Sequence, residues 1–246
     1  MSGTSGDGVD ASIIQSDGKS NYEVIKDRYF EYDQDIYKNI HDLKKRINNF
    51  NDLKIHLTDI KALEKKITLF HAQVIIDISK NQNIDLIGFH GQTIYHNSKE
   101  KTSRQLGDGD LLFQLIKKNI VFNFRANDIK NGGEGAPLTP IFHHLVLKQK
   151  NISSPACILN IGGISNLTIV MNENLYDMSS RDIGPGNCLI DSWLRSNSKK
   201  KFDKDGKIAS RGKTNEIILE QAQELYSNRL NKENLSLDVN DFDVSF

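Results

Sequence analysis

Between residues 84 and 93 the chain reads Ile84-Asp85-Leu86-Ile87-Gly88-Phe89-His90-Gly91-Gln92-Thr93. Its first six residues have the apolar character of a short buried strand, and a polar segment follows at the C-terminal end of that strand. In folds that alternate strands and helices, binding sites form beside the carboxyl ends of the strands. This stretch therefore predicts an α/β fold with a polar site after residue 89.

The same alternation extends on both sides of this stretch. Two short strands joined by a turn are predicted at 9–14 and 22–25, and the spacing of apolar side chains makes residues 33–80 mostly helical. Next we predict a helix at 109–118, a strand at 120–124 that ends at Arg125, and a helix that begins at Pro137. Strands at 156–161 and 166–170 follow, with helices after residue 187 and at 213–229. The class is α/β.

Composition excludes several kinds of protein. Lys plus Arg and Asp plus Glu both number 32, so the chain has no basic excess of the kind that nucleic-acid binding needs. No apolar run reaches the roughly 20 residues that span a bilayer, and the first residues do not form a signal peptide. Cys157 and Cys188 lack a CxxC pairing and are predicted to be small core side chains. We expect a cytoplasmic protein without nucleic-acid or membrane partners.

Three turns have the composition of a cradle for phosphate or sugar: residues 3–8, 160–163 and 182–187. Glycine lets backbone N–H groups approach an anion closely. Each turn alone is also typical of an ordinary connection between strands, and the first is not a P-loop because it lacks GxxxxGK[ST]. Asp7 is a candidate Mg²⁺ ligand, since that ion favours a few carboxylates together with substrate phosphates.

Two charged residues are candidates for chemistry. Asp182 precedes a Gly-Pro-Gly turn and a predicted helix, so it is a candidate general base, or alternatively an N-cap or turn aspartate. Arg125 follows a predicted strand and is a candidate clamp for a carboxylate or phosphate, or alternatively an ion-pair partner of Asp128.

Other chemistries find little support in the sequence. His90, His96, His143 and His144 do not match the spacing of zinc signatures. The run Asp203-Lys204-Asp205-Gly206 is a surface turn by this interpretation, because it lacks the remaining acidic positions of a calcium loop. There is no GxSxG motif, which disfavours a hydrolase.

Several segments together resemble one family, the anhydro-N-acetylmuramic acid kinases. Residues 1–10 are similar to the family's MSGTSxDGxD opening, and His90–Thr93 with His96 is similar to HGQTxxH. The further resemblances are Gln105–Asp108 to QxGD, residues 124–143 to FRxxDxxxGGxGAPLxPxFH, Asn160–Asn166 to NIGGIxN, Asp182–Asn187 with Asp191 to DTGPGNxxxD, and Phe202–Gly206 to YDxxG. These matches occur in the family's order along the chain.

The resemblance implies an actin-like, ribonuclease-H-like fold of two lobes with the active site in their cleft. Residues 1–125 would form the first lobe, with the phosphate-binding turn and the HGQT segment. Residues 126–246 would supply the sugar-binding loop and the start of the second lobe. The implied reaction converts 1,6-anhydro-N-acetylmuramic acid to N-acetylmuramic acid 6-phosphate with ATP and Mg²⁺, in peptidoglycan recycling in a bacterial cytoplasm. It also suggests a homodimer.

The resemblance assigns a role to each matching residue. Asp182 would activate the water that opens the anhydro bridge. The ATP site would use Gly3, Thr4, Ser5, Asp7, Gly8, Asn160, Gly162 and Gly163, with Asp7 on Mg²⁺. The sugar site would use His90, Gln92, Arg125, Gly133, Gly135, Ala136, Pro137, Gly184 and Asn187.

The chain also departs from the family pattern. Gly6 stands where leucine is usual, and Ile183 stands where threonine is usual. Family members have a first strand before the MSGTS segment, and after a segment like residues 236–242 they continue with an adenosine loop. We therefore expect a missing first strand and an incomplete second lobe. One alternative is a working kinase that assembles with a separately encoded C-terminal fragment, and another is a truncated, non-catalytic sugar-binding remnant. A third, an actin-like phosphotransferase for a different sugar, is disfavoured by the GGxGAPL loop.

Overall fold

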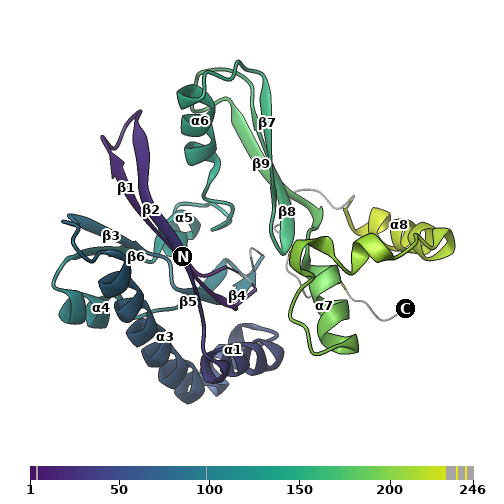
Figure 1. Ribbon diagram of the computed structural model, residues 1–246, viewed down its shortest axis with the longest axis horizontal. Helices are drawn as coiled ribbons and strands as arrows, with labels where there is room; N and C mark the ends of the chain where they lie inside the picture. Colours follow the sequence, from purple (N-terminus) through teal and green to yellow (C-terminus); the bar gives the residue numbers. More distant parts are fainter. Residues whose placement is uncertain (4, 98, 231–236, 238–241, 243–246) are drawn as a thin grey trace. The chain divides into compact units, whose positions relative to one another are not determined.

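Helices and strands are mixed along the whole chain in the computed structural model (Figure 1), which describes residues 1–3, 5–97, 99–230, 237 and 242. The mixed α/β class predicted from the sequence is confirmed. The chain separates into two units, Met1–Leu138 and Thr139–Phe246, each with its own internal contacts. The division into lobes after residue 125 stays a prediction, because lobe membership is a different criterion from compactness.

The first unit opens with the predicted antiparallel pair. Strand β1 (Gly8–Ser16) pairs with β2 (Tyr22–Glu31), with Gly8 opposite Glu31 and Ser16 opposite Tyr22. The turn between them is organised by Asp17, whose carboxylate accepts the backbone N–H groups of Lys19 and Ser20 at 2.9 Å. An aspartate that satisfies its own turn in this way is the physical reason for a tight connection here.

Three helices follow. Helix α1 (Gln34–Arg46) begins after Asp33, whose side chain accepts the N–H of Ile36, and it ends before α2 (Phe50–Ile55). Asn49 and Asp52 form a reciprocal capping box at the start of α2, so the apolar spacing of residues 43–53 belongs to two helices rather than one. Helix α3 (Leu57–Ile78) is the long helix that the spacing predicts.

Helix α3 connects two apolar clusters of the first unit, and it lies beside α1 (Figure 1). The larger cluster joins α3 to α1, β1, β4 and β5; it contains Val9, Tyr32, Ile36, Ile40, Leu43, Ile47, Ile60, Leu63, Ile67, Val74, Ile94, Tyr95 and Leu106. The smaller cluster joins α3 to β3 and α4 through Ala72, Phe89 and Leu112. Burial of this apolar surface is the main stabilising contribution to the unit.

The other strands of the first unit form two short pairs. Strand β3 (Leu86–Phe89) runs parallel to β6 (Asn119–Phe122), with helix α4 (Gly109–Ile116) between them in sequence, as predicted. Strand β4 (Gln92–Asn97) pairs antiparallel with β5 (Thr102–Leu106), a hairpin that the sequence analysis did not predict. Its residues are partly polar on both faces, so apolar alternation gave no signal there.

One prediction in this region is wrong. The strand expected at 120–124, ending at Arg125, stops at Phe122, and Phe124 and Arg125 open helix α5 (Phe124–Lys130). Asn123 separates the two elements with a left-handed backbone (φ 61°). Asparagine adopts that conformation more readily than most residues, and it lets the chain change direction within one residue.

The second unit is a three-stranded antiparallel sheet with helices. Strands β7 (Ala156–Ile161), β8 (Ile164–Val170) and β9 (Met178–Pro185) pair in the order β7-β8-β9, and α6 (Pro140–Gln149) lies alongside the sheet (Figure 1). Helix α7 (Cys188–Asn197) follows β9. After two short 3₁₀ turns, Lys204–Gly206 and Ala209–Arg211, helix α8 (Glu216–Leu230) follows.

Three predictions about the second unit need correction. Residues 178–185 form a strand that was not predicted, so Asp182 lies in a sheet and is neither an N-cap nor a turn residue. The helix expected at Pro137 begins at Pro140, which occupies its first turn. Cys188 is buried as predicted, whereas Cys157 is exposed on β7. In the part of the chain that is described, no helix has the length and apolar character to cross a membrane.

We predict that the buried His71 makes the protein less stable as the pH is lowered from about 6.5 to about 4. Burial lowers the pKa of His71 to about 4, against about 6.5 in an unfolded chain. Between these values the unfolded chain binds a proton that the folded chain does not. The free energy of unfolding therefore falls as pH falls through this window, by at most about 1.4 kcal/mol per pH unit for this group.

The variant His71→Phe removes the histidine that binds this proton. Between pH 6.5 and pH 4.5 its thermal midpoint should therefore drop less than that of the parent. Above pH 7.5 the two midpoints should depend on pH in parallel, which serves as the internal control. Equal drops in the acid range would contradict the assignment. The pKa of His90 is lowered in the same direction by burial and by the Arg125 charge, so part of the pH dependence should remain.

Candidate functional site

The N-terminal turn holds the first group of candidate residues. The N–H of Gly6 donates to the carbonyl of Gly3 at 3.1 Å, which closes the turn, and the Ser5 hydroxyl donates to the Asp7 carboxylate at 2.6 Å. Thr4 lies outside the described residues. Gly8 is a packing residue of β1, since a Cβ added there would lie 2.4 Å from the carbonyl oxygen of Phe30.

Gln92 connects this turn to the core. Its side chain has no exposed surface, and its Nε2 donates to the carbonyls of Gly3 at 2.9 Å and Thr93 at 3.1 Å. Its Oε1 accepts from the hydroxyl of Ser2, which in turn accepts from the Tyr32 hydroxyl at 3.0 Å. The Gln92 amide therefore holds the backbone of Gly3 and the side chain of Ser2 in place through hydrogen bonds. The role predicted for Gln92 was contact with the sugar, and that role stays a prediction.

His90 holds the Arg125 side chain. The Arg125 Nε donates to His90 Nε2 at 3.1 Å, and His90 Nδ1 lies 2.8 Å from the carbonyl of Gly91. Because Arg can only donate, His90 must accept at Nε2 and carry its proton on Nδ1, which then donates to Gly91. Burial, followed by the Arg125 charge, lowers the pKa of His90 to about 4. His90 is therefore neutral near pH 7 and orients the guanidinium.

The glycine-rich loop of the first unit folds around Asp128. Gly135 donates its N–H to the Asp128 carboxylate at 2.8 Å, and Gly133 donates to the Asp128 carbonyl at 2.9 Å. The carboxylate thus organises the loop that carries Gly133, Gly135, Ala136 and Pro137. The sequence left open an ion pair between Arg125 and Asp128; the contacts described place Arg125 against His90 and Asp128 against Gly135.

In the second unit the two glycine-rich turns are bonded to each other. Three N–H groups donate across the junction: Gly186 to Gly163 at 2.9 Å, Asn187 to Gly162 at 2.8 Å and Cys188 to Gly163 at 3.2 Å. A Cβ at Gly186 would lie 2.3 Å from the carbonyl oxygen of Gly162, so only glycine permits this approach. The candidate residues Gly162, Gly163 and Asn187 are brought together by this junction.

A row of polar side chains crosses the sheet next to the junction. Asn160 on β7 lies opposite Asn166 on β8, and Asn166 lies opposite Asp182 on β9. Directly opposed residues point to the same face of a sheet, with Cβ atoms about 5 Å apart. The Asp182 carboxylate also accepts the N–H of Leu237 at 2.8 Å. Asp182 therefore stands in a polar row at the end of the strand that leads to Gly184.

Asn166 is the residue that the site prediction missed. Its side-chain Oδ1 is buried and has no hydrogen-bond partner among the described residues. The sequence contained a signal, because Asn166 ends the NIGGIxN segment. No local rule distinguishes it from a structural asparagine, and the pairing with Asp182 exists only in the sheet.

The alternative chemistries can be compared with the structure. His143 Nδ1 lies 2.8 Å from the Thr168 hydroxyl, and His144 Nε2 lies 3.0 Å from the carbonyl of Glu173. Among the described residues, no group of three or more His, Cys, Asp and Glu side chains is placed to hold a metal ion. Asp203 accepts the N–H groups of Ile208 and Ala209 at 2.9 Å, which is the behaviour of a turn residue.

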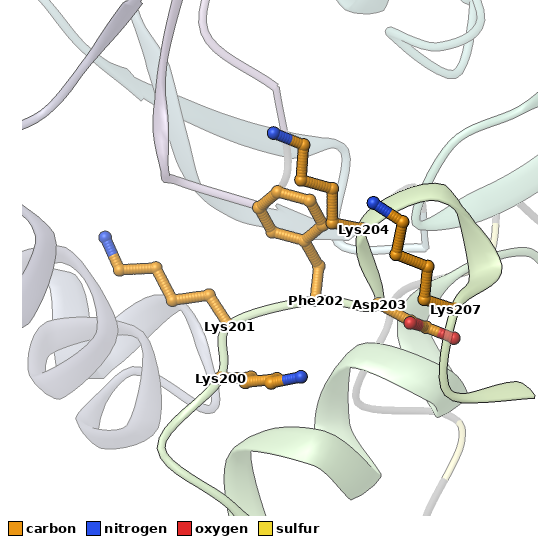
Figure 2. Close-up of a pocket in the computed structure, with 6 residues that line it drawn as sticks. All are labelled: Lys200, Lys201, Phe202, Asp203, Lys204 and Lys207. Atoms are coloured by element: carbon orange, nitrogen blue, oxygen red, sulfur yellow. The ribbon is translucent and has the colours of Figure 1, made fainter.

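A pocket of about 310 Å³ lies at that turn, and Figure 2 shows the side chains that line it. It is lined by Lys200, Lys201, Phe202, Asp203, Lys204 and Lys207. Lys207 forms an ion pair with Asp205 at 3.2 Å. None of the residues predicted for the ATP or sugar site lines this pocket, so it contributes nothing to the candidate site.

Comparison with known proteins agrees with the sequence resemblance. The sequence profile of the family described as anhydro-N-acetylmuramic acid kinase matches residues 1–233. A protein of that name from Pelagibacter ubique (strain HTCC1062) is 56% identical over 248 residues, which cover 100% of this chain and 66% of the relative. One from Agrobacterium fabrum is 36% identical over 219 residues, covering 86% of this chain and 58% of the relative. One from Zymomonas mobilis is 35% identical over 254 residues, covering 99% of this chain and 68% of the relative. The chain thus spans roughly three fifths to two thirds of the length of these relatives.

We predict that Gln92→Leu destabilises the first unit by about 2–4 kcal/mol, because the fully buried Gln92 amide is lost and the partly buried carbonyls of Gly3 and Thr93 lose a donor. The matched control is Gln105→Leu on the partner strand, whose partly exposed amide bonds the hydroxyls of Thr93 and Ser103 and no buried carbonyl among the described residues. It should cost less than about 1 kcal/mol. Urea unfolding of both variants measures the difference, and equal midpoints would show that the Gln92 network is not stabilising.

Gly186→Ala should destabilise the second unit by roughly 1–3 kcal/mol, since the added methyl group overlaps the Gly162 carbonyl. Gly162→Ala is the matched control, because its Cβ would meet nothing nearer than 3.5 Å. Thermal unfolding followed by circular dichroism should show a lower midpoint for Gly186→Ala only. A midpoint of Gly186→Ala equal to that of the parent would contradict the bonded junction.

Proposed function

This chain belongs to the anhydro-N-acetylmuramic acid kinase family, and from that premise we propose that it phosphorylates 1,6-anhydro-N-acetylmuramic acid with opening of the anhydro ring. The product would be N-acetylmuramic acid 6-phosphate. In this reaction the oxygen of a water molecule bonds to the anomeric carbon while the bond between that carbon and O6 breaks. O6 then accepts a phosphoryl group, and the proton of the water passes to a base. ATP supplies the transferable phosphoryl group and leaves as ADP.

The observation that carries this proposal is the position of Asp182. Its carboxylate lies in a polar row of the second unit, and the turn that follows it is bonded to residues 162–163. A general base must be held in place to act on a water, and both the sheet pairing and the turn junction hold Asp182. We assign Asp182 as the general base that accepts a proton from the attacking water. Gly184 and Asn187 follow this carboxylate in the sequence and are assigned to the sugar.

The first unit would contribute anion-binding groups. The Gly3–Gly8 turn, held by Gln92, offers backbone N–H groups and the Ser5 hydroxyl, which suit phosphate oxygens. Arg125 is oriented by neutral His90 and is assigned to the lactyl carboxylate of the sugar, where a guanidinium can bind in bidentate fashion. The loop organised by Asp128 supplies Gly133, Gly135, Ala136 and Pro137 to the same substrate.

The residues present fit a nucleotide with Mg²⁺. A Cβ at Gly3 would lie in van der Waals contact with the Ser5 hydroxyl oxygen at 3.6 Å, so no described atom overlaps the position beside this backbone, which we assign to a phosphate group. A Cβ at Gly162 would likewise meet its nearest neighbour at a contact distance of 3.5 Å, and Gly162 is assigned to the phosphates with Asn160 and Gly163. Asp7 is assigned as the carboxylate ligand of Mg²⁺, an ion that binds one or two protein carboxylates and takes its other ligands from phosphates and water.

The finer features that the resemblance implies belong to the same proposal. They are an actin-like fold of two lobes, divided after residue 125. The protein would act in the cytoplasm, in peptidoglycan recycling, as a homodimer. Its small-molecule partner is the anhydro sugar.

A non-catalytic sugar-binding remnant is the alternative, and ligand-dependent stability distinguishes it from a kinase. A ligand that binds the native state raises the thermal midpoint. The kinase predicts a rise with 1,6-anhydro-N-acetylmuramic acid, a further rise with Mg-ATP, and sugar-dependent release of ADP. The remnant predicts a rise with the sugar alone. No rise with either ligand, in a sample that unfolds cooperatively, would overturn the assignment for this chain.

We predict that Asp182→Asn lowers kcat for ADP release at least about 100-fold, because an amide cannot take the proton of the water. The rise of the midpoint with the sugar should remain. Asp177→Asn is the matched control, since Asp177 lies in the exposed turn before β9 and bonds Asn172 there. A coupled ADP assay measures both variants. Parent-like activity of Asp182→Asn would remove Asp182 from the mechanism.

A further inference from the structure

The row Asn160–Asn166–Asp182 contains an acceptor that no described residue uses. Asn166 Oδ1 is buried and has no partner among the described residues. A buried polar atom without a hydrogen bond destabilises a fold, and such atoms are rare in native structures. Its position beside a candidate catalytic carboxylate suggests that a ligand supplies the missing donor.

The neighbouring row on the same face shows the opposite behaviour. Thr168 is two residues further along β8, so its side chain points to the same face as that of Asn166. Its hydroxyl is fully buried and bonded to His143 on α6 at 2.8 Å and to Ser180 on β9 at 3.1 Å. Helix α6 thus supplies a hydrogen-bond partner for the Thr168 hydroxyl through His143. None of the described hydrogen bonds of α6 reaches Asn166. The unpaired oxygen is a local feature of the row that contains Asp182.

The chemistry of the row limits what can bind there. A carboxylate at Asp182 only accepts hydrogen bonds, and it has room for several, of which Leu237 supplies one. The Asn166 Oδ1 also only accepts. Two acceptors that face the same way, with their Cβ atoms about 5 Å apart, call for a small molecule with two donors. Water has two O–H groups and matches this requirement.

We propose that Asn166 Oδ1 and the Asp182 carboxylate together hold the attacking water, each accepting one of its O–H groups. This inference rests on the proposed function. In the step, the water oxygen bonds to the anomeric carbon and the bond between that carbon and O6 breaks, with O6 taking the phosphoryl group. The proton bonded to Asp182 passes to that carboxylate. The other hydrogen stays on the oxygen, bonded to Asn166, and becomes part of the new anomeric hydroxyl.

Two variants of nearly the same shape test this assignment. Asn166→Leu removes the acceptor, and Asn166→Asp keeps an acceptor oxygen at the same position. For Asn166→Leu we expect a kcat at least tenfold below the parent and a KM for the sugar within threefold of it. Its thermal midpoint should equal or exceed that of the parent, because an unpaired buried polar atom has been replaced by an apolar group. Asn166→Asp should keep a higher kcat than Asn166→Leu.

Thr168→Val is the matched control on the same strand and face. It removes a hydroxyl that the protein itself uses, so its midpoint should fall while kcat and KM stay within threefold of the parent. The opposite response of stability in Asn166→Leu and Thr168→Val separates a functional acceptor from a structural one. A lower midpoint together with an unchanged kcat in Asn166→Leu would make Asn166 structural and overturn the inference.

Two further outcomes are decisive. If Asn166→Leu raises KM for the sugar and leaves kcat unchanged, Asn166 binds a sugar hydroxyl rather than the water, and the inference fails. If the parent is active, Asp182→Asn is inactive and Asn166→Leu matches the parent, the inference fails while the proposed function stands. A parent chain without sugar-dependent ADP release overturns the proposed function and this inference with it.

Discussion

The buried amide of Gln92 is the interaction on which the N-terminal turn depends. Because its side chain has no exposed surface, each of its donors and acceptors must find a partner inside the protein. It bonds Gly3, Thr93 and Ser2, and through Ser2 it reaches Tyr32 in the largest apolar cluster. The turn that is assigned to phosphate is thereby tied to the packing of α1 and α3. A site built in this way keeps its shape without a ligand, which lowers the cost of binding.

In the second unit, backbone hydrogen bonds rather than a buried side chain hold the candidate turns in place. The two glycine-rich turns are joined by three N–H···O bonds, and Gly186 permits the approach because it has no Cβ. The sheet then aligns Asn160, Asn166 and Asp182, which come from three different strands. In this row the Asn166 Oδ1 is an exception to the rule that buried polar atoms are paired, since none of the described residues bonds it. Proteins tolerate such a cost where a ligand uses the atom, which is why the exception is informative about function.

The elements that could be predicted are those whose signal is local. The β1–β2 hairpin, helix α3 and strand β7 follow from apolar periodicity and turn residues over fewer than about 25 residues. Strand β9 gave no such signal, because Met178-Ser179-Ser180-Arg181-Asp182 is mostly polar and becomes a strand by pairing with β8. Helix α5 was missed for a related reason: the apolar run through Phe122 and Phe124 continues across the turn at Asn123, where only the backbone changes.

The sequence by itself determined the family, the mixed α/β class and the set of candidate residues, since residue types in a fixed order are properties of the chain alone. Only the tertiary structure decided how those residues support one another. Gln92 holds the N-terminal turn through Gly3, and His90 holds the Arg125 side chain. Asp182 lies in a strand rather than before a helix. Asn166 became a candidate only through its place opposite Asp182. Hydrogen bonds between residues up to 90 positions apart decide these roles, and no local pattern in a sequence specifies which distant partners will meet.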